Sequence, residues 1–424
     1  MFSWTLGKIR KSFLLCVYLA SLSAVGIRIL KHLCFFLLQL FTWGCNDEGA
    51  LGRVTNQDNG EEYRSGSVQL NLTSKVVQTS AGDSHTAALL EDGNVYAWGT
   101  FRVSDFCCFQ CTACQFQPIN VNSIQFLLPL SNVLYIFIQD ANGAIGLTPN
   151  GQSNEPIKVY PTLKTHGRAV KITSGNDHVA ILTENGEIYT FGSGEQGQLG
   201  RIKECFSHRG GRRGLPLLLV PQVIKFRKKH KFTDIFSGSF QTFAVSGDSN
   251  DVYAWGLNNW GQLGAGNTIN HFTPIFLDAL TDMRKDCGQS MGMAGGQHHS
   301  VIVNGKGKVY SVGRSEYGRL GHGDNAEEIS VPKQVTENLE NHNVKEIACG
   351  ETVSFAITKN GDLFAWGLGS SLQLGNGSED DVLVPMQVKG KFLDPSKQEV
   401  ICVSAGGQHT AILIKERPQN PNVE

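Results

Sequence analysis

The sequence predicts an all-β fold of the β-propeller class, in which short antiparallel sheets, called blades, are arranged around a central axis. Three observations predict it. A pattern of about 55 residues recurs along the chain, glycine accounts for 48 of the 424 residues, and the repeat lacks the 3.6-residue apolar period of a helix. Short strands joined by tight turns satisfy all three observations.

Each copy of the repeat contains the signals of short strands joined by turns. An apolar segment such as HTAALL is followed by an Asp-Gly or Asn-Gly turn, an aromatic strand such as NVYAWG and a closing G-x-L-G. Such segments between glycine turns are typical of β-hairpins, so one copy accounts for a four-stranded blade. The full copies occupy residues 81–99, 174–200, 237–264, 294–321 and 348–375.

The spacing of the copies locates an insertion. The glycine that closes each aromatic strand recurs at intervals of 55, 93, 64, 57 and 54 residues. Removing residues 103–139, which lack the repeat, shortens the long interval to 56 residues. We therefore expect 103–139 to be an insertion of 37 residues within a blade loop. The spacing is measured at Gly44, Gly99, Gly192, Gly256, Gly313 and Gly367.

Two partial copies, WGCNDEGALG at 43–52 and SAGGQHTAILIKE at 404–416, flank the full ones. A propeller closes by pairing strands from both chain ends within one blade, which removes open sheet edges. We therefore expect the partial copies to form one composite blade, which makes six blades in all. The predicted organisation is an atypical hydrophobic segment at 1–42, a propeller at 43–416 and a tail at 417–424.

The composition excludes several classes of function. Basic and acidic side chains number 37 and 38, so any binding to nucleic acid or membrane needs a local patch. The 11 cysteines are an odd number and disfavour a secreted disulfide framework. Cys108, Cys111 and Cys114 have an iron–sulfur-like spacing without a fourth ligand, so we expect no metal site. No P-loop, HExxH or nucleophile elbow occurs, and we expect no cofactor, no small-molecule substrate and no covalent chemistry.

The N-terminal segment permits a second interpretation. Three basic residues precede the apolar run 12–27, a pattern that signal peptides and short anchors share. Further basic residues interrupt the run before 34–41, so a membrane span is imperfect. We expect no membrane association. The alternative is a membrane-anchored or secreted, lectin-like propeller that uses residues 1–42 for targeting.

The repeat motifs A-G-x-x-H, V-Y-x-W-G and G-Q-L-G, together with CNDEGALGR, SAGDSHTAAL, GSGEQGQLGR, GGQHH and EYGRLG, resemble the regulator of chromosome condensation family over 43–102 and 140–416. The resemblance implies a seven-bladed propeller, of which one N-terminal blade is degraded or replaced here. It also implies a nuclear, chromatin-associated exchange factor that ejects GDP from the small GTPase Ran so that GTP can load. Such a factor acts by binding the nucleotide-free GTPase more tightly than the loaded form.

The resemblance implies a set of GTPase-contacting residues in equivalent loops of several blades. The first choices are Asp83, Asp177, His298 and His409, and the weaker candidates in neighbouring loops are Asn176, Arg201 and Asn259. A plainer interpretation stands beside it. The histidines His85, His178, His298 and His409 are expected to share one repeat position, where a histidine can simply bond backbone within its blade. The aspartates can simply form turns.

A projecting β-wedge of the family, which pushes at the phosphate-binding region of the GTPase, matches the chain at both ends of the insertion. The matching residues are Phe101, Arg102, Asp140, Asn142 and Gly143. Because 103–139 lies between them, an alternative function is a non-catalytic propeller scaffold that docks partners but has lost exchange.

Two basic stretches suggest further partners. The stretch 208–213, with Arg209, Arg212 and Arg213, matches a family loop that contacts the acidic patch of the nucleosome. Arginine suits carboxylates because its planar fork donates two parallel hydrogen bonds. The stretch 225–231 is either a solvated loop or a nuclear-import or DNA-phosphate contact. The expected partners are therefore Ran, the nucleosome and DNA, and the expected location is the nucleus.

Overall fold

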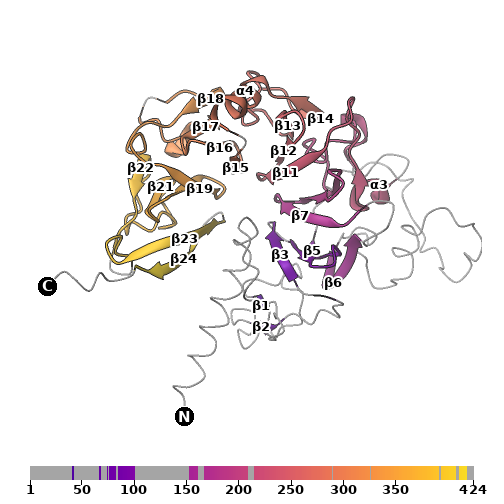
Figure 1. Cartoon of the computed structure of the whole chain (residues 1–424), viewed down its shortest axis with the longest axis horizontal. Coiled ribbons are helices and arrows are strands. Elements are labelled where there is room, and N and C mark those ends of the chain that lie inside the picture. Colours follow the sequence, from indigo (N-terminus) through magenta and orange to yellow (C-terminus); the bar gives the residue numbers. More distant parts are fainter. Residues whose placement is uncertain are drawn as a thin grey trace, which may run out of the picture.

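The computed structural model shows consecutive four-stranded antiparallel sheets arranged in an arc around a central opening (Figure 1). In the sheets whose first and fourth strands Figure 1 labels, the first strand lies nearest the centre of the arc and the fourth lies farthest from it. The all-β propeller prediction is confirmed. The structure describes residues 41–42, 66–67, 74, 76–82, 85–100, 152–160, 167–208, 214–288, 290–324, 326–390, 393–406 and 410–417.

The described residues form five complete blades, which match the five full copies of the repeat. The first contains β3 (Val76–Ala81), β4 (His85–Leu90), β5 (Val95–Thr100) and β6 (Gln152–Tyr160). The second contains β7 (Ala169–Ser174), β8 (His178–Thr183), β9 (Ile188–Gly192) and β10 (Gln222–Val223). The third contains β11 (Phe232–Ser237), β12 (Gln241–Ser246), β13 (Val252–Gly256) and β14 (His271–Phe276). The fourth contains β15 (Met291–Gly295), β16 (His299–Asn304), β17 (Val309–Gly313) and β18 (Ile329–Gln334). The fifth contains β19 (Val344–Cys349), β20 (Val353–Thr358), β21 (Leu363–Gly367) and β22 (Val382–Gln387).

A sixth, partial blade follows at the C-terminal end of the arc. It consists of β23 (Gln398–Ala405) and β24 (Thr410–Glu416). The short strands β1 (Phe41–Thr42) and β2 (Gly66–Ser67) pair with each other, so the described neighbour of β24 is β23 alone. Within the described residues the arrangement thus has six blades, five complete and one partial. The expected pairing of residues 43–52 with β24 lies outside the described residues and stays a prediction.

Few helices accompany the strands in the part of the chain that the structure describes. The turns η4 (Glu204–Phe206) and η6 (Glu316–Gly318) and the helices α3 (Leu215–Leu219) and α4 (Asp278–Cys287) all lie in connections between strands. Figure 1 shows α3 and α4 on the outside of the arc. The hairpin and closing-glycine signals therefore predicted the strands of the described blades correctly.

The glycine that closes each aromatic strand is required by its backbone geometry. At Gly256 φ is 112°, a region that favours glycine, and a Cβ atom would overlap the carbonyl oxygen of Phe240. Gly192, Gly313 and Gly367 have φ values of 115°, 116° and 117° in the same place of their blades. The repeat glycine thus lets the third strand of a blade pass close to the loop before the second.

The hydrophobic core lies between consecutive blades. Each core cluster draws its residues from two neighbouring sheets, for example Phe243 and Val252 of the third blade with Met293 and Ile302 of the fourth. Apolar faces of adjacent sheets therefore bury each other, which is how blades that are too small to fold alone become stable.

Repeated side-chain hydrogen bonds reinforce these apolar contacts. Trp255 is fully buried and donates its Nε1–H to the carbonyl oxygen of Gln198 in the preceding blade at 2.9 Å, and Trp366 does the same to Arg319. In four blades, the third to the sixth, one hydroxyl donates to the equivalent loop carbonyl of the preceding blade. The donor–acceptor pairs are Thr242–Gln198, Ser300–Gln262, Ser354–Arg319 and Thr410–Gln373, at 3.2, 2.8, 2.9 and 2.8 Å.

Candidate docking face

The loops between the first and second strands of successive blades are joined to one another along the arc. The backbone N–H of Asn176 donates to the carbonyl oxygen of Ser239 in the next blade at 2.9 Å, and Ser239 in turn donates to Gly296 at 3.2 Å. Gln297 then donates to Glu351 of the fifth blade at 3.1 Å. These loops therefore form one continuous rim whose residues hold fixed relative positions.

The strand register corrects the predicted repeat position of one histidine. His85 pairs with Gly99 and His178 pairs with Gly192, and the residue that pairs with the matching Gly313 is His299. The prediction that His298 shares the position of His85 and His178 was therefore wrong by one residue. The reason is that the fourth copy contains two consecutive histidines, and only pairing across the sheet distinguishes them.

The histidines at the shared position connect blades. Nε2 of His178 lies 2.8 Å from the hydroxyl oxygen of Thr242, and Nε2 of His299 lies 2.9 Å from that of Ser354. Complete burial of the imidazole rings lowers the pKa of His85, His178 and His299 to about 3, so the rings are neutral at pH 7. The plainer interpretation expected His178 to bond backbone within its own blade, but its described side-chain partner is a hydroxyl of the next blade.

Asp177 and His298 occupy one equivalent position on the rim. The carbonyl oxygen of Asp177 accepts from the N–H of Ser193 at 2.7 Å, and that of His298 accepts from the N–H of Arg314 at 2.9 Å. Asp177 is 9% exposed and His298 is half-buried. The predicted Asp83 and His409 lie outside the described residues.

The weaker candidates lie in different surroundings. Asn176 is part of the rim, and Asn259 is exposed in the loop after β13, where its Oδ1 accepts from Nε2 of Gln262 at 3.2 Å. The guanidinium of Arg201 points inward, and burial lowers its pKa to about 9. Arg201 donates to the carbonyl oxygens of Thr190, Leu217, Leu218 and Val220 and to Thr190 Oγ1. Arg201 therefore anchors α3 to the second blade.

A cluster that the sequence analysis did not single out lies beside His298. The guanidinium of Arg314 stacks over the ring of Trp260 with its carbon 4.5 Å from the ring centroid, and the Trp260 and His298 rings meet edge-on at 6.4 Å. Arg314 also pairs with Glu316 at 2.7 Å. The EYGRLG motif was the available signal, because it is the copy in which arginine replaces the glutamine of G-Q-L-G.

The electrostatic surroundings keep His298 neutral. Burial lowers its pKa, and the positive charges of Arg319 and Arg314 lower it further, while Glu316 opposes them. At neutral pH the ring therefore carries one N–H donor and one acceptor nitrogen. Nδ1 is buried and makes no hydrogen bond within the described part of the chain.

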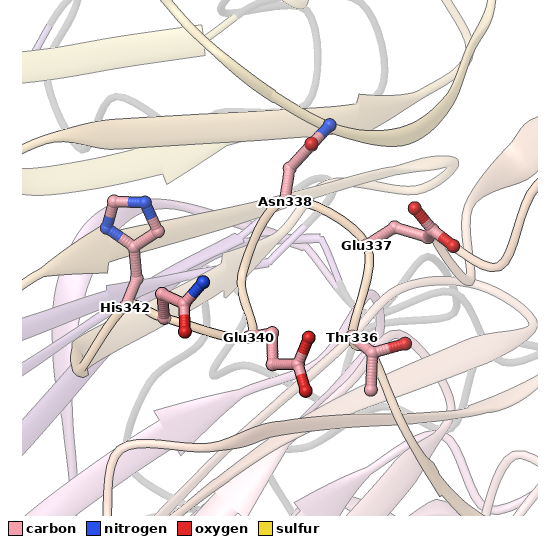
Figure 2. A pocket seen from close by; sticks show the side chains of 6 residues that line it. Thr336, Glu337, Asn338, Glu340 and His342 are labelled. Atoms are coloured by element: carbon pink, nitrogen blue, oxygen red, sulfur yellow. The ribbon is translucent and has the colours of Figure 1, made fainter.

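A shallow polar hollow of about 280 Å³ lies on the turn that follows β18. Figure 2 shows that Asn338 and Glu340 point away from each other on opposite sides of this turn, so the lining groups do not converge on one point. Ligand pockets are usually larger and mostly apolar. No group of three or more His, Cys, Asp or Glu is placed to hold a metal ion among the described residues.

In the part of the chain that the structure describes, no helix combines the length and the apolar composition that a membrane span requires.

Comparison with protein families identifies the repeat. The RCC1-like domain matches residues 122–412, and the regulator of chromosome condensation (RCC1) repeat matches residues 76–101. The chain belongs to the regulator of chromosome condensation family. The protein named regulator of chromosome condensation from Xenopus laevis is 44% identical over 383 residues, which are 89% of this chain and 78% of that protein.

Two yeast relatives extend the comparison. Guanine nucleotide exchange factor SRM1 from Saccharomyces cerevisiae is 29% identical over 87% of this chain and 74% of its own length. The crystal structure of Prp20p from Saccharomyces cerevisiae, described with its binding properties to Gsp1p and histones, superposes with a TM-score of 0.66. That comparison has 26% sequence identity and covers 90% of this chain and 79% of Prp20p.

Several of the residues predicted from the family resemblance lie outside the described residues. These are the wedge residues Phe101, Arg102, Asp140, Asn142 and Gly143 and the loop residues Arg209, Arg212 and Arg213. The second basic stretch, 225–231, is described. Phe226 packs on Phe232 with ring centroids 4.5 Å apart, and His230 Nε2 lies 2.9 Å from the Tyr253 hydroxyl. These contacts hold a basic loop whose other side chains are exposed: Lys225, Arg227, Lys228, Lys229 and Lys231.

Proposed function

We propose that this protein is a guanine-nucleotide exchange factor for the small GTPase Ran, and that it works on chromatin. The observation that carries the proposal is the rim of hydrogen-bonded loops, which holds Asp177 of the second blade and His298 of the fourth, with the exposed Asn259 of the third blade in the loop after β13. A rigid, multi-blade surface is what binding to a protein partner needs, because little conformational entropy is lost on docking.

The names of relatives support the proposal. A yeast relative is named a guanine nucleotide exchange factor, and the similar Prp20p structure is described with binding to Gsp1p and histones. Exchange requires no covalent step. The rim binds the GTPase, and the wedge residues Phe101, Arg102, Asp140, Asn142 and Gly143 act on its phosphate-binding region, so that the nucleotide-free form is the one bound most tightly.

The placement of the basic loop supports simultaneous binding of chromatin. Loop 225–231 precedes β11, and the rim residue Ser239 follows it, so the two lie at opposite ends of one strand. DNA phosphates would meet the exposed lysines and arginine of this loop, while Arg209, Arg212 and Arg213 would meet the acidic patch of the nucleosome. A GTPase on the rim would leave the basic loop 225–231 free, in keeping with a nuclear, chromatin-associated location.

One feature of the sequence favours a second candidate function. Residues 103–139 separate Arg102 from Asp140, the two ends of the proposed wedge. A chain with a separated wedge can still dock the GTPase through the rim, because the rim residues belong to other blades. The second candidate is therefore a propeller scaffold that binds Ran without promoting exchange.

Release of fluorescent GDP from purified Ran tests both candidates. The assay compares the full chain with a chain lacking 103–139, and each of these with its Asp177→Ala variant. Asp251→Ala is the matched control, because Asp251 lies between β12 and β13, at the end of the third blade away from the rim. The exchange-factor proposal is supported if the chain accelerates GDP release, Asp177→Ala abolishes this acceleration and Asp251→Ala preserves it. If neither chain accelerates release although both are folded, the exchange proposal is rejected; Ran binding without release then supports the scaffold.

A further inference from the structure

The fourth blade departs from its neighbours in the loop that follows the third strand. In the other described loops a glutamine side chain accepts a backbone N–H, as Gln262 does from Trp260 at 3.0 Å. The fourth blade has Arg319 at this position, and a guanidinium has no acceptor atom. Instead, Arg319 Nε donates to the carbonyl oxygen of Glu316 at 2.7 Å, and Tyr317 takes a left-handed φ of 61°. The glutamine arrangement recurs as Gln198–Gln196 and Gln373–Ser371, at 2.8 and 2.7 Å.

This departure is energetically unfavourable without a compensating role. A non-glycine residue with left-handed φ is strained, and Arg319 buries a charge, since only 1% of it is exposed. The glutamine of the other blades carries no charge, and the residues that match Tyr317 there, Gln196, Trp260 and Ser371, do not have a left-handed φ. Strain and buried charge that a simpler residue would remove are characteristic of functional sites.

The cluster around Arg319 carries one positive charge in excess. Nη2 of Arg314 lies 2.7 Å from Oε2 of Glu316, and Nη2 of Arg319 lies 3.6 Å from the same oxygen. Two guanidinium groups therefore share one carboxylate, and the adjacent His298 adds no charge because its pKa is lowered. Among the described ion pairs of these arginines, Glu316 is the acidic partner in both.

The excess charge is held in a fixed orientation at the rim. Arg314 lies flat against Trp260 at 4.5 Å while Glu316 holds one edge of its guanidinium, and about 30% of the Arg314 side chain stays exposed. The guanidinium of Arg319 lies 5.2 Å from the ring of Tyr317 and is paired with the same Glu316 carboxylate. A stacked and paired arginine loses little rotamer freedom on binding, and its remaining N–H groups match a carboxylate in a planar, bidentate arrangement.

We propose that Arg314, held between Trp260 and Glu316, receives an aspartate or glutamate side chain of the docked GTPase. The inference rests on the proposed function and adds the chemistry of one contact. The negative charge of that carboxylate complements the excess positive charge of the two arginines. His298 and the exposed Asn259 lie in the neighbouring loops, beside this contact. Trp260 is a positioning residue, because it acts by orienting the guanidinium.

The test measures the dissociation constant of the full chain for nucleotide-free Ran in phosphate-free buffer, so that no phosphate competes for Arg314. The variants are Arg314→Gln, Arg314→Lys and Trp260→Leu, and thermal unfolding checks that each is folded. Arg168→Gln is the matched control, because Arg168 also pairs with a glutamate, Glu184, but precedes β7 and so lies at the end of the blade away from the rim.

We expect Arg314→Gln to weaken binding about ten-fold or more. Arg314→Lys should retain only part of the affinity that Arg314→Gln loses, because lysine lacks the planar guanidinium that binds a carboxylate through two hydrogen bonds. Binding by Arg314→Gln should also depend less on salt, and Arg168→Gln should bind like the unaltered chain. If Arg314 had only a structural role, its replacement would leave the salt dependence of binding unchanged.

Charge reversal identifies the partner group. Arg314→Glu is tested against Ran variants in which single surface carboxylates are changed to lysine, and one of them should restore binding. Undiminished binding by a folded Arg314→Gln chain overturns the inference while the proposed function stands. Absence of binding by the unaltered chain overturns the proposed function, and the inference falls with it.

Discussion

Nε2 of His178 lies 2.8 Å from Oγ1 of Thr242, so that a buried imidazole of the second blade meets a buried hydroxyl of the third. The same hydroxyl donates to the carbonyl oxygen of Gln198. His299 and Ser354 repeat the contact between the fourth and fifth blades. Neighbouring blades are therefore held in register by polar groups within an otherwise apolar interface.

Thr242→Val should destabilise the protein, because it removes the hydroxyl and leaves Nε2 of His178 buried without this partner. Each such loss costs about 1–3 kcal/mol. The measurement is urea unfolding followed by tryptophan fluorescence. Thr233→Val, at an exposed position of β11, is the control and should change stability by less than about 0.5 kcal/mol. Equal effects at the two positions would contradict the inter-blade role.

The buried histidines should make stability depend on pH. The pKa of His178 and of His299 is about 3 when folded, against 6.5 as the ordinary value. Between these values the unfolded chain binds more protons, so stability is present above pH 6.5 and is lost as the pH falls towards 3. Between pH 7 and pH 5 each histidine should remove about 2 kcal/mol.

His178→Gln and His299→Gln isolate this effect, because the third blade already has Gln241 at the same position, with Nε2 3.3 Å from the hydroxyl of Ser300. We expect the double variant to unfold with a weaker pH dependence than the unaltered chain. Denaturant unfolding at pH 7 and pH 5 measures it, with the exposed His208→Gln as control. An unchanged pH dependence in the double variant would show that other groups are responsible.

Leu372→Gly should stabilise the protein. Leu372 has φ 57° at the repeat position that Gly197, Gly261 and Gly318 occupy in other blades, and half of its surface is exposed, so little packing is lost. Relief of the left-handed strain should raise the free energy of unfolding by about 0.5–1 kcal/mol after the entropy cost of glycine. Leu372→Ala keeps the Cβ atom and should give no gain; an equal gain from alanine rules out strain as the cause.

Lys228→Ala combined with Lys229→Ala should weaken DNA binding if the basic loop contacts phosphates. The slope of log K against log salt should fall by about 2, and GDP release from Ran should be unchanged, because the rim is at the other end of the strand. Lys359→Ala with Lys389→Ala, exposed in the fifth blade, is the control. If only the control variant showed a smaller salt dependence of DNA binding, the DNA contact would lie in the fifth blade and not in the basic loop.

Much of the fold could be predicted because its signals are local. Strand pattern, turn glycines and repeat period are properties of short segments, and they located five complete blades and the partial sixth. The rim position of Asn176 and Asp177 followed from the same repeat. His298 was assigned one residue out of place, because two consecutive histidines satisfy the motif equally well and only the pairing of His299 with Gly313 separates them.

The sequence by itself determined the class of fold, the blade boundaries and the family, since each depends on a pattern that recurs along one chain. Only the tertiary structure decided how side chains of different blades meet. It turned Arg201 inward onto the carbonyls around α3, and it stacked Arg314 on Trp260 from the preceding blade. Such contacts depend on the packing of one sheet against the next, and no local periodicity encodes that geometry.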